Sequence, residues 1–73
     1  MKKLTDLKQD QKATVQKISA PEPLRSRLLG LGVLKGAHVQ LKNYTLKKRT
    51  YEVEIDRTNI ALREEEAQGI LVE

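Results

Sequence analysis

The spacing of leucines after the two prolines of the chain is typical of an amphipathic helix. In the segment APEPLRSRLLGLG, Leu24, Leu28 and Leu31 lie at positions i, i+4 and i+7, so they share one helical face. Proline is well tolerated where a helix begins, because the first N–H groups there have no partner inside the helix. We expect Gly30 or Gly32 to supply the left-handed residue that ends this helix.

Alternating apolar positions predict strands on both sides of the helix. Residues 4–12 are expected to form a turn-rich lead-in to the first strand. In that strand Ala13 and Val15 alternate and Ile18 falls out of phase, which predicts a β-bulge or a strand end. After the helix, the segments AHVQLKNYTL and TYEVEIDRTNIALR both have the two-residue period of half-buried strands.

These two later segments are expected to pair as an antiparallel hairpin. If their apolar residues face one core, Val39 lies opposite Ile55 and Leu41 lies opposite Val53. This register requires a loop with an odd number of residues around 46–49.

A second hairpin is expected directly after the first. Placing its apolar residues on the same face puts Ile60 opposite Ile55 and Leu62 opposite Val53. The connection is then a two-residue turn at Arg57–Thr58, without the glycine that such turns usually contain.

The remaining segments complete a small, mostly β architecture. REEEAQG is expected to form one short helical turn that ends at Gly69, and ILVE a closing strand. The 73 residues leave room for a single domain, 1–73. A chain of this size hides only about 60% of its unfolded surface, so its core is thin. The pattern predicts a small β-barrel with one helix and a short C-terminal helical turn.

Charge is divided unevenly along the chain, whose formal net charge is +4. Residues 1–49 contain 12 Lys and Arg against 3 Asp and Glu, whereas residues 50–73 contain 2 against 7. A basic half is compatible with nucleic acid or an acidic partner. The hairpin register also places Lys42 opposite Glu52, so we expect the two halves to pair internally across the sheet.

No segment has the pattern of a signal peptide or a membrane span. The start, MKKLTDLKQDQKATV, has two lysines with no apolar run behind them, and LLGLGVL is far shorter than a span. We therefore expect a cytoplasmic protein that is not embedded in a membrane. The absence of cysteine excludes disulfides and thiolate metal sites.

The sequence offers little for catalysis. His38 is the only histidine and is expected to face solvent, where a transition-metal site would need further ligands nearby. The acidic residues 64–66 are interpreted as a solvated surface. Gly30, Gly32 and Gly36 follow a helix and lead into a strand, which is the reverse of the order in a dinucleotide-binding loop. We expect neither an enzyme nor a bound cofactor.

Nucleic-acid binding is an alternative that the charge keeps open. The isoelectric point of about 9.6 and the basic run Lys47–Arg49 are compatible with it. Only Tyr44 and Tyr51 could stack on bases, whereas proteins that bind single strands use several rings. A transition-metal-binding interaction module is a further alternative.

Surplus leucines indicate a protein-docking surface. Leu29, Leu34 and Leu46 exceed what a thin core holds, and basic residues flank them. Local packing over the ends of the barrel would account for these leucines equally well. For the docking interpretation, the predicted partner-binding residues are Arg25, Arg27, Leu34, Lys35, Leu46 and Lys47.

Four segments together resemble the FeoA family of bacterial ferrous iron transport proteins: LTDLKQDQKATVQKI, LRSRLLGLGVLKGAHVQL, YEVEI and IALREEEAQGILVE. They cover nearly the whole chain. The resemblance implies an SH3-like β-barrel with an inserted helix and a cytoplasmic accessory role in ferrous iron uptake. The partner that it implies is the FeoB membrane transporter, whose cytosolic part is a GTP-binding domain. It implies no catalytic residue, and YTLKKRTY stands where the family often has a proline-rich hairpin.

Overall fold

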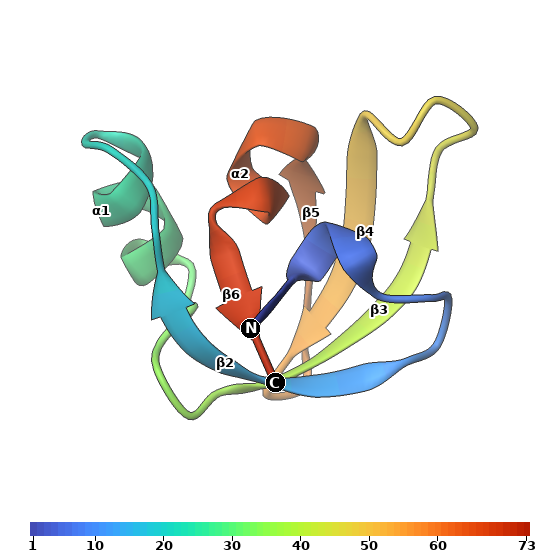
Figure 1. The fold of residues 1–73 in the computed structure, drawn as a ribbon, viewed down its shortest axis with the longest axis horizontal. Helices are drawn as coiled ribbons and strands as arrows, with labels where there is room; N and C mark the ends of the chain where they lie inside the picture. Colours follow the sequence, from blue (N-terminus) through green and yellow to red (C-terminus); the bar gives the residue numbers. More distant parts are fainter.

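Six antiparallel strands form one curved sheet in the order β1-β6-β2-β3-β4-β5 (Figure 1). The computed structural model describes all residues, 1–73. The strands are β1 (Lys2–Lys3), β2 (Lys12–Ile18), β3 (His38–Tyr44), β4 (Thr50–Ile55), β5 (Thr58–Arg63) and β6 (Ile70–Val72). Three helical segments complete the fold: the 3-10 turn η1 (Leu4–Asp6), α1 (Leu24–Gly30) and α2 (Glu64–Gln68). The predicted fold class, mostly β with one inserted helix and a short C-terminal helical turn, is confirmed.

The core lies inside the curve of this sheet. It comprises 15 buried apolar residues, to which every strand except β1 contributes. Val39, Leu41, Val53 and Ile55 are among them, so the alternation that predicted β3 and β4 also identifies their inner faces. Leu4, the first residue of η1, and Leu7, directly after η1, are both buried in this core.

The predicted bulge in β2 is confirmed. Val15 pairs with Val72 and Lys17 with Leu71, so the register on β6 shifts between Val15 and Lys17. This shift places Ile18 opposite Ile70 and accounts for the phase change in the sequence.

The first hairpin has the predicted pairs, but its register changes near the turn. Val39 lies opposite Ile55 and Leu41 opposite Val53, as expected. A bulge then occurs between Leu41 and Asn43, and Asn43 lies opposite Glu52. The predicted Lys42–Glu52 pair is therefore wrong, because Lys42 is the extra residue of the bulge. Its Nζ instead lies 3.8 Å from Oε1 of Glu54.

The bulge also alters the turn of this hairpin. Tyr44 pairs with Tyr51, which leaves an even number of residues between them instead of the predicted odd number. One extra residue on one strand reverses the parity that the apolar alternation requires.

The second hairpin differs from the prediction by two residues in register. Ile55 pairs with Thr58 and Val53 with Ile60, and the turn lies at Asp56–Arg57 rather than at Arg57–Thr58. Asp56 and Arg57 have φ values of 46° and 74°, the left-handed conformation that a two-residue turn of type I′ needs at both positions. A shift of two residues leaves the same side chains on the inner face.

Helix α1 follows the predicted leucine stripe. Leu28 is fully buried, while Leu24 and Leu31 are half-buried against the core. Gly32, rather than Gly30, adopts the left-handed conformation after the helix, with φ of 91°. Gly36 has the same φ where the chain turns into β3. No helix in this structure has the length and apolar character that crossing a membrane requires.

Candidate functional site

The side chains form no metal-binding cluster. No group of three or more His, Asp and Glu residues lies close enough together to hold a metal ion. His38 is exposed on β3, as predicted, and its backbone N–H donates a hydrogen bond to Oδ1 of Asp56 at 3.0 Å. Both residues line an open recess of about 640 Å³. The candidate site built from the predicted residues is a binding surface elsewhere on the molecule.

The six residues predicted to bind a partner lie in two separate places. Arg25, Arg27, Leu34 and Lys35 belong to α1 and the turn after it, and we call them the helix surface. Residues 45–49 join β3 to β4 and include Leu46 and Lys47; we call this segment the hairpin tip. Figure 1 shows α1 and the β3–β4 connection at opposite ends of the long axis of the molecule. The structure therefore does not combine all six residues into one patch.

The helix surface combines an exposed leucine with free cations. Leu34 keeps 53% of its surface exposed, whereas Leu29 is half-buried. Arg25 and Lys35 are both exposed, and neither takes part in the two ion pairs of the structure. An apolar residue beside unpaired cations suits an acidic partner surface with an apolar recess.

The start of α1 is fixed by the side chain of Glu22. Its Oε1 accepts the backbone N–H of Ser26 at 2.8 Å, and the Ser26 hydroxyl donates to both carboxylate oxygens, at 2.8 and 2.9 Å. These hydrogen bonds, the hydroxyl first, lower the pKa of Glu22 from its ordinary value of 4.5, and the nearby charge of Arg25 adds to the effect. A carboxylate at this end of a helix also interacts favourably with the positive end of the helix dipole.

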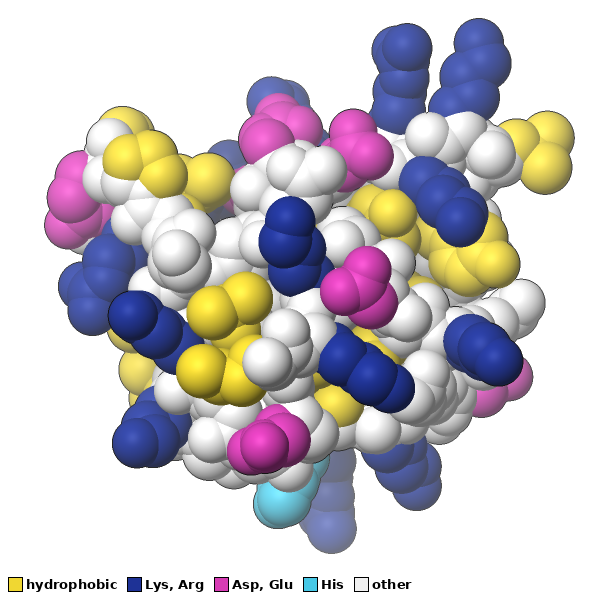
Figure 2. Space-filling view, viewed as in Figure 1, with side chains coloured by type: hydrophobic (Ala, Val, Ile, Leu, Met, Phe, Trp, Pro, Cys, Tyr) yellow, Lys and Arg dark blue, Asp and Glu magenta, His cyan; other side chains and the backbone are white.

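The hairpin tip is held in one conformation by hydrogen bonds around Thr45. The Thr45 hydroxyl accepts the backbone N–H of Arg49 at 3.1 Å and that of Thr50 at 3.4 Å. The N–H of Lys48 donates to the Thr45 carbonyl at 2.8 Å, and Lys48 has φ of 53°. Leu46 is left fully exposed at the apex. Figure 2 shows hydrophobic side chains next to Lys and Arg side chains over this connection.

Two tyrosines form the base of the hairpin tip. The rings of Tyr44 and Tyr51 lie 6.2 Å apart, centroid to centroid, and Nζ of Lys48 lies 5.6 Å from the centroid of Tyr44. Burial raises the pKa of Tyr51 from its ordinary value of 10.0, and the charge of Glu64 adds to this rise. Tyr51 is buried and Tyr44 is 37% exposed, so only one ring is accessible for stacking.

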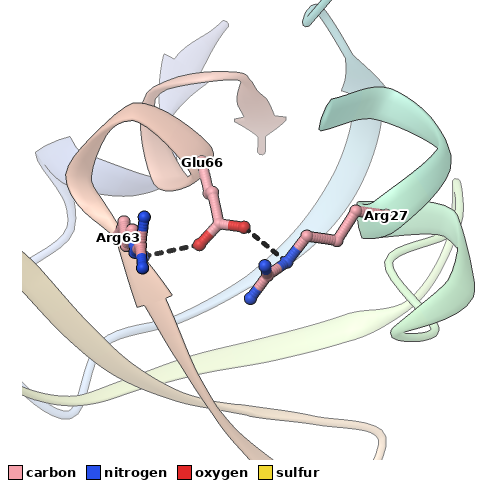
Figure 3. Close-up of polar contacts among 3 residues, drawn as sticks. All are labelled: Arg27, Arg63 and Glu66. Atoms are coloured by element: carbon pink, nitrogen blue, oxygen red, sulfur yellow. Dashed lines mark hydrogen bonds and ion pairs between the residues drawn. The ribbon is translucent and has the colours of Figure 1, made fainter. Parts of the chain in front are cut away.

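Arg27 forms an ion pair with a buried residue of the same chain, a contact that the sequence did not predict. Its Nε lies 2.8 Å from Oε2 of Glu66, whose side chain is only 3% exposed (Figure 3). Oε1 of Glu66 accepts the backbone N–H of Arg63 at 2.8 Å. The interpretation of residues 64–66 as a solvated surface is thus wrong for Glu66. The three-residue spacing from Arg63 to Glu66 matches the glutamate position of a capping box, a signal that could have identified this role.

Comparisons with known proteins agree on one family. The model of the FeoA domain matches residues 2–73. A protein of Campylobacter jejuni named Fe(2+) transport protein A is 36% identical over 69 residues, which cover 94% of this chain and 93% of that protein.

Two solved structures show the same fold. The FeoA protein of Chlorobium tepidum has a TM-score of 0.89 and 31% identity, over 97% of this chain and 68% of that chain. The FeoA of Stenotrophomonas maltophilia, solved with zinc and described as a prokaryotic SH3 domain protein, has a TM-score of 0.87 and 26% identity, over 100% of this chain and 91% of that chain. The resemblance found in the sequence and the SH3-like fold that it implied are both confirmed.

Proposed function

Because this chain belongs to the FeoA family of ferrous iron transport proteins, we propose that it acts as an adaptor of an FeoB-type membrane transporter. In this proposal it works in the cytoplasm, is not an enzyme, and binds the cytosolic face of the transporter, including its GTP-binding domain. Its contribution is a binding surface, since its side chains offer no catalytic set.

The observation that carries this proposal is the exposed Leu34, which is followed in the turn by the exposed Lys35 and preceded on α1 by the exposed Arg25, neither of them in an ion pair. Large exposed apolar side chains are few in this chain, and Leu34 lies in the turn between two left-handed glycines, Gly32 and Gly36. These glycines fix the path of the turn and hence the position of Leu34. We propose that Leu34 enters an apolar recess of the partner while the cations face acidic groups at its rim.

Arg27 has a different place in this proposal. Its guanidinium pairs with the buried carboxylate of Glu66 and so holds α1 in position, while 58% of its side chain stays exposed for the partner. Substituting Arg27 would disturb the helix as well as the surface, and it is therefore a poor test of docking. Arg25 lies on the same helix without an ion-pair partner and is the better choice.

The test is an NMR titration of the isotope-labelled protein with the cytosolic domain of an FeoB-type transporter from the same organism, with and without a GTP analogue. Amide shifts are expected in α1 and in the turn that contains Leu34. The double variant Arg25→Gln/Leu34→Gln is expected to bind at least about tenfold more weakly, because one buried leucine and one cation are lost.

The control for this test removes the same residue types at the other end of the molecule. The variant Leu46→Gln/Lys47→Gln also loses one exposed leucine and one cation, but from the hairpin tip. It is expected to bind the isolated cytosolic domain as the unchanged protein does. Absence of shifts with either nucleotide state, or equal binding by the helix double variant, would remove the helix surface from the proposal.

Nucleic-acid binding is the less favoured alternative. A binder of single strands needs several accessible rings, whereas Tyr51 is buried and Tyr44 is partly covered by Lys48. Metal binding by the protein itself lacks a cluster of ligands on which to build.

A further inference from the structure

The hairpin tip carries a concentration of positive charge that takes part in no ion pair. The segment 43–51 reads NYTLKKRTY and contains no acidic residue. Lys47, Lys48 and Arg49 are all exposed, and none takes part in either ion pair of the structure. Between them and the β3 strand, Leu46 projects fully into solvent. Exposing a whole leucine at the apex of an ordered turn is unfavourable for a chain that stays in water.

We propose that the hairpin tip binds the surface of an anionic lipid bilayer. Leu46 inserts its side chain among the acyl chains near the headgroups, and Lys47, Lys48 and Arg49 contact the lipid phosphates. This inference goes beyond the adaptor function and does not depend on it, because it rests on residues at the opposite end of the molecule from the helix surface.

The combination of side chains matches the chemistry of a membrane interface. An alkyl group gains free energy at the boundary between headgroups and acyl chains, while Lys and Arg keep their charges in the headgroup layer. Tyr44, which is 37% exposed next to Lys48, has the amphipathic ring that is enriched at this depth. The three chemical elements of an interfacial anchor are thus adjacent on one ordered turn.

The shape of the tip favours a lipid surface over an acidic protein. A stable protein interface buries about 800 Å² on each partner. The segment 45–49 is a narrow connection between two strands with Leu46 as its one large apolar side chain, so it offers little of the apolar area that such an interface needs. A bilayer needs no preformed recess, because lipids rearrange around an inserted side chain.

The elements next to the hairpin tip carry charges of both signs. A recess between η1 and the hairpin is lined by Asp6, Lys8, Tyr44, Lys48 and Tyr51. Lys8 is exposed and adds a fourth cation on this side. The acidic residues on this side are Asp6, whose carboxylate accepts the backbone N–H of Lys3 at 3.0 Å, and Glu64 at the start of α2, whose backbone N–H donates to the Arg49 carbonyl at 2.9 Å. The four cations outnumber these two carboxylates. The balance of charge at this end of the molecule remains positive.

The first experiment is co-sedimentation of the full chain with vesicles at low ionic strength. Binding is expected to vesicles of equal parts phosphatidylcholine and phosphatidylglycerol, and not to pure phosphatidylcholine. The triple variant Lys47→Gln/Lys48→Asn/Arg49→Gln is expected to bind about 100-fold more weakly, since each cation near an anionic surface contributes a factor of about 5. Asparagine is used at position 48 because it tolerates the left-handed backbone there.

The matched control distinguishes the effect of the tip cations from the effect of the net charge of the protein. The variant Lys2→Gln/Lys12→Gln/Lys17→Gln removes three exposed cations from β1 and β2 instead. It is expected to keep most of the vesicle binding. Equal losses in the two triple variants would overturn the proposal, because binding would then follow total charge rather than the tip.

The second experiment measures insertion directly. The chain has no tryptophan, so Leu46→Trp places a single fluorescent reporter at the apex, and Leu34→Trp places one on the helix surface. With anionic vesicles, a blue shift and quenching by brominated acyl chains are expected for Leu46→Trp only. A reporter at position 46 that stays in water while the protein co-sediments would overturn insertion.

The two proposals fail separately. If the triple variant of the tip keeps its affinity for anionic vesicles but no longer binds the isolated cytosolic domain of the transporter, the tip is a protein-docking site and the lipid proposal is wrong. If vesicle binding follows the predicted pattern while the NMR titration shows no shifts, the lipid proposal stands and the adaptor proposal fails.

Discussion

Nε of Arg27 lies 2.8 Å from Oε2 of Glu66, and this contact joins α1 to α2 across a long separation in sequence. The two partners differ in exposure, with 58% of the arginine side chain accessible against 3% of the glutamate side chain. Glu66 also accepts the N–H of Arg63 at the start of α2, so one buried carboxylate fixes the start of one helix and the position of another. The stability of the helix surface is therefore linked to a residue far from it in the chain.

Replacement of Glu66 by alanine is expected to destabilise the fold by about 2–3 kcal/mol. The change removes the hydrogen bond that caps α2 and the charged partner of Arg27. Replacement of Arg27 by alanine is expected to cost about 1–2 kcal/mol, because solvent still reaches this pair. Denaturant unfolding of each variant measures both values.

A double-mutant cycle tests whether the two residues act through each other. The double variant Arg27→Ala/Glu66→Ala is expected to cost at least about 0.5 kcal/mol less than the sum of the single changes. Arg25→Ala is the control, because Arg25 lies on the same helix without an ion pair, and its cost is expected to stay within about 0.5 kcal/mol. Strict additivity would mean that the contact contributes nothing to stability.

Replacement of Ser26 by alanine is expected to raise the pKa of Glu22 toward its ordinary value of 4.5. In the folded protein the Ser26 hydroxyl and N–H lower this pKa, so the carboxylate stays ionised at more acidic pH. The contribution of this contact to stability is present above the pKa of the unfolded chain and is lost as pH falls through the lower, folded pKa. The side-chain carboxyl shift of Glu22, followed by NMR against pH, measures the change.

Ser26→Thr is the control for this titration, since it keeps a hydroxyl at the same position. Its Glu22 pKa is expected to stay low. A pKa that is the same in the alanine variant as in the unchanged protein would show that the Ser26 hydroxyl does not perturb Glu22.

The pairing of β3 with β4 could be predicted because side chains on a strand alternate between two faces. Val39, Leu41, Val53 and Ile55 have one arrangement that buries all four, and the structure has it. The bulge at Lys42 could not be predicted in this way. The alternation of Val39 and Leu41 stops before it, and only Tyr44, which lies three residues after Leu41 and opposite the buried Tyr51, marks the change of phase.

The features that the sequence did not reveal depend on contacts between distant segments. Glu66 is one of three consecutive glutamates; its spacing from Arg63 marks a capping role, but its ion pair with Arg27 depends on how the fold places α1. The division of the docking residues into two surfaces has the same origin. Leu34 and Leu46 have similar flanking charges in the sequence, and only the fold shows that α1 and the β3–β4 connection lie at opposite ends of the molecule (Figure 1).

Replacement by alanine is expected to destabilise the protein at Gly69 and to stabilise it at Gly30. At Gly69 an added Cβ would lie 3.0 Å from Cβ of Ala20 and 3.2 Å from the carbonyl oxygen of Ser19. The N–H of Ser19 donates to the Gly69 carbonyl, so the two segments cannot separate without losing that bond. Gly69→Ala is therefore expected to cost about 1–3 kcal/mol by crowding.

Gly30→Ala is the matched control, because the side chain that it adds lies in open space. No atom lies within 4 Å of the Cβ that it would add, and its φ is not in the left-handed region. It is expected to stabilise the protein by about 0.5 kcal/mol, because alanine favours the helical conformation. Thermal unfolding of both variants compares them directly, and a gain in stability from Gly69→Ala would contradict the close approach at Ala20.

Replacement of Arg57 by glycine is expected to stabilise the protein by about 0.5 kcal/mol. Arg57 has φ of 74° in the two-residue turn between β4 and β5, a conformation that costs a non-glycine residue roughly 1–2 kcal/mol. Glycine removes this strain, although its greater freedom in the unfolded chain offsets part of the gain.

Asp56→Gly relieves the backbone strain in the same turn but also removes the carboxylate that accepts the His38 N–H at 3.0 Å. It is therefore expected to lower stability by about 0.5–1 kcal/mol. Denaturant unfolding of the two variants distinguishes strain from side-chain bonding, since equal changes at both positions would mean that the Asp56–His38 bond contributes nothing.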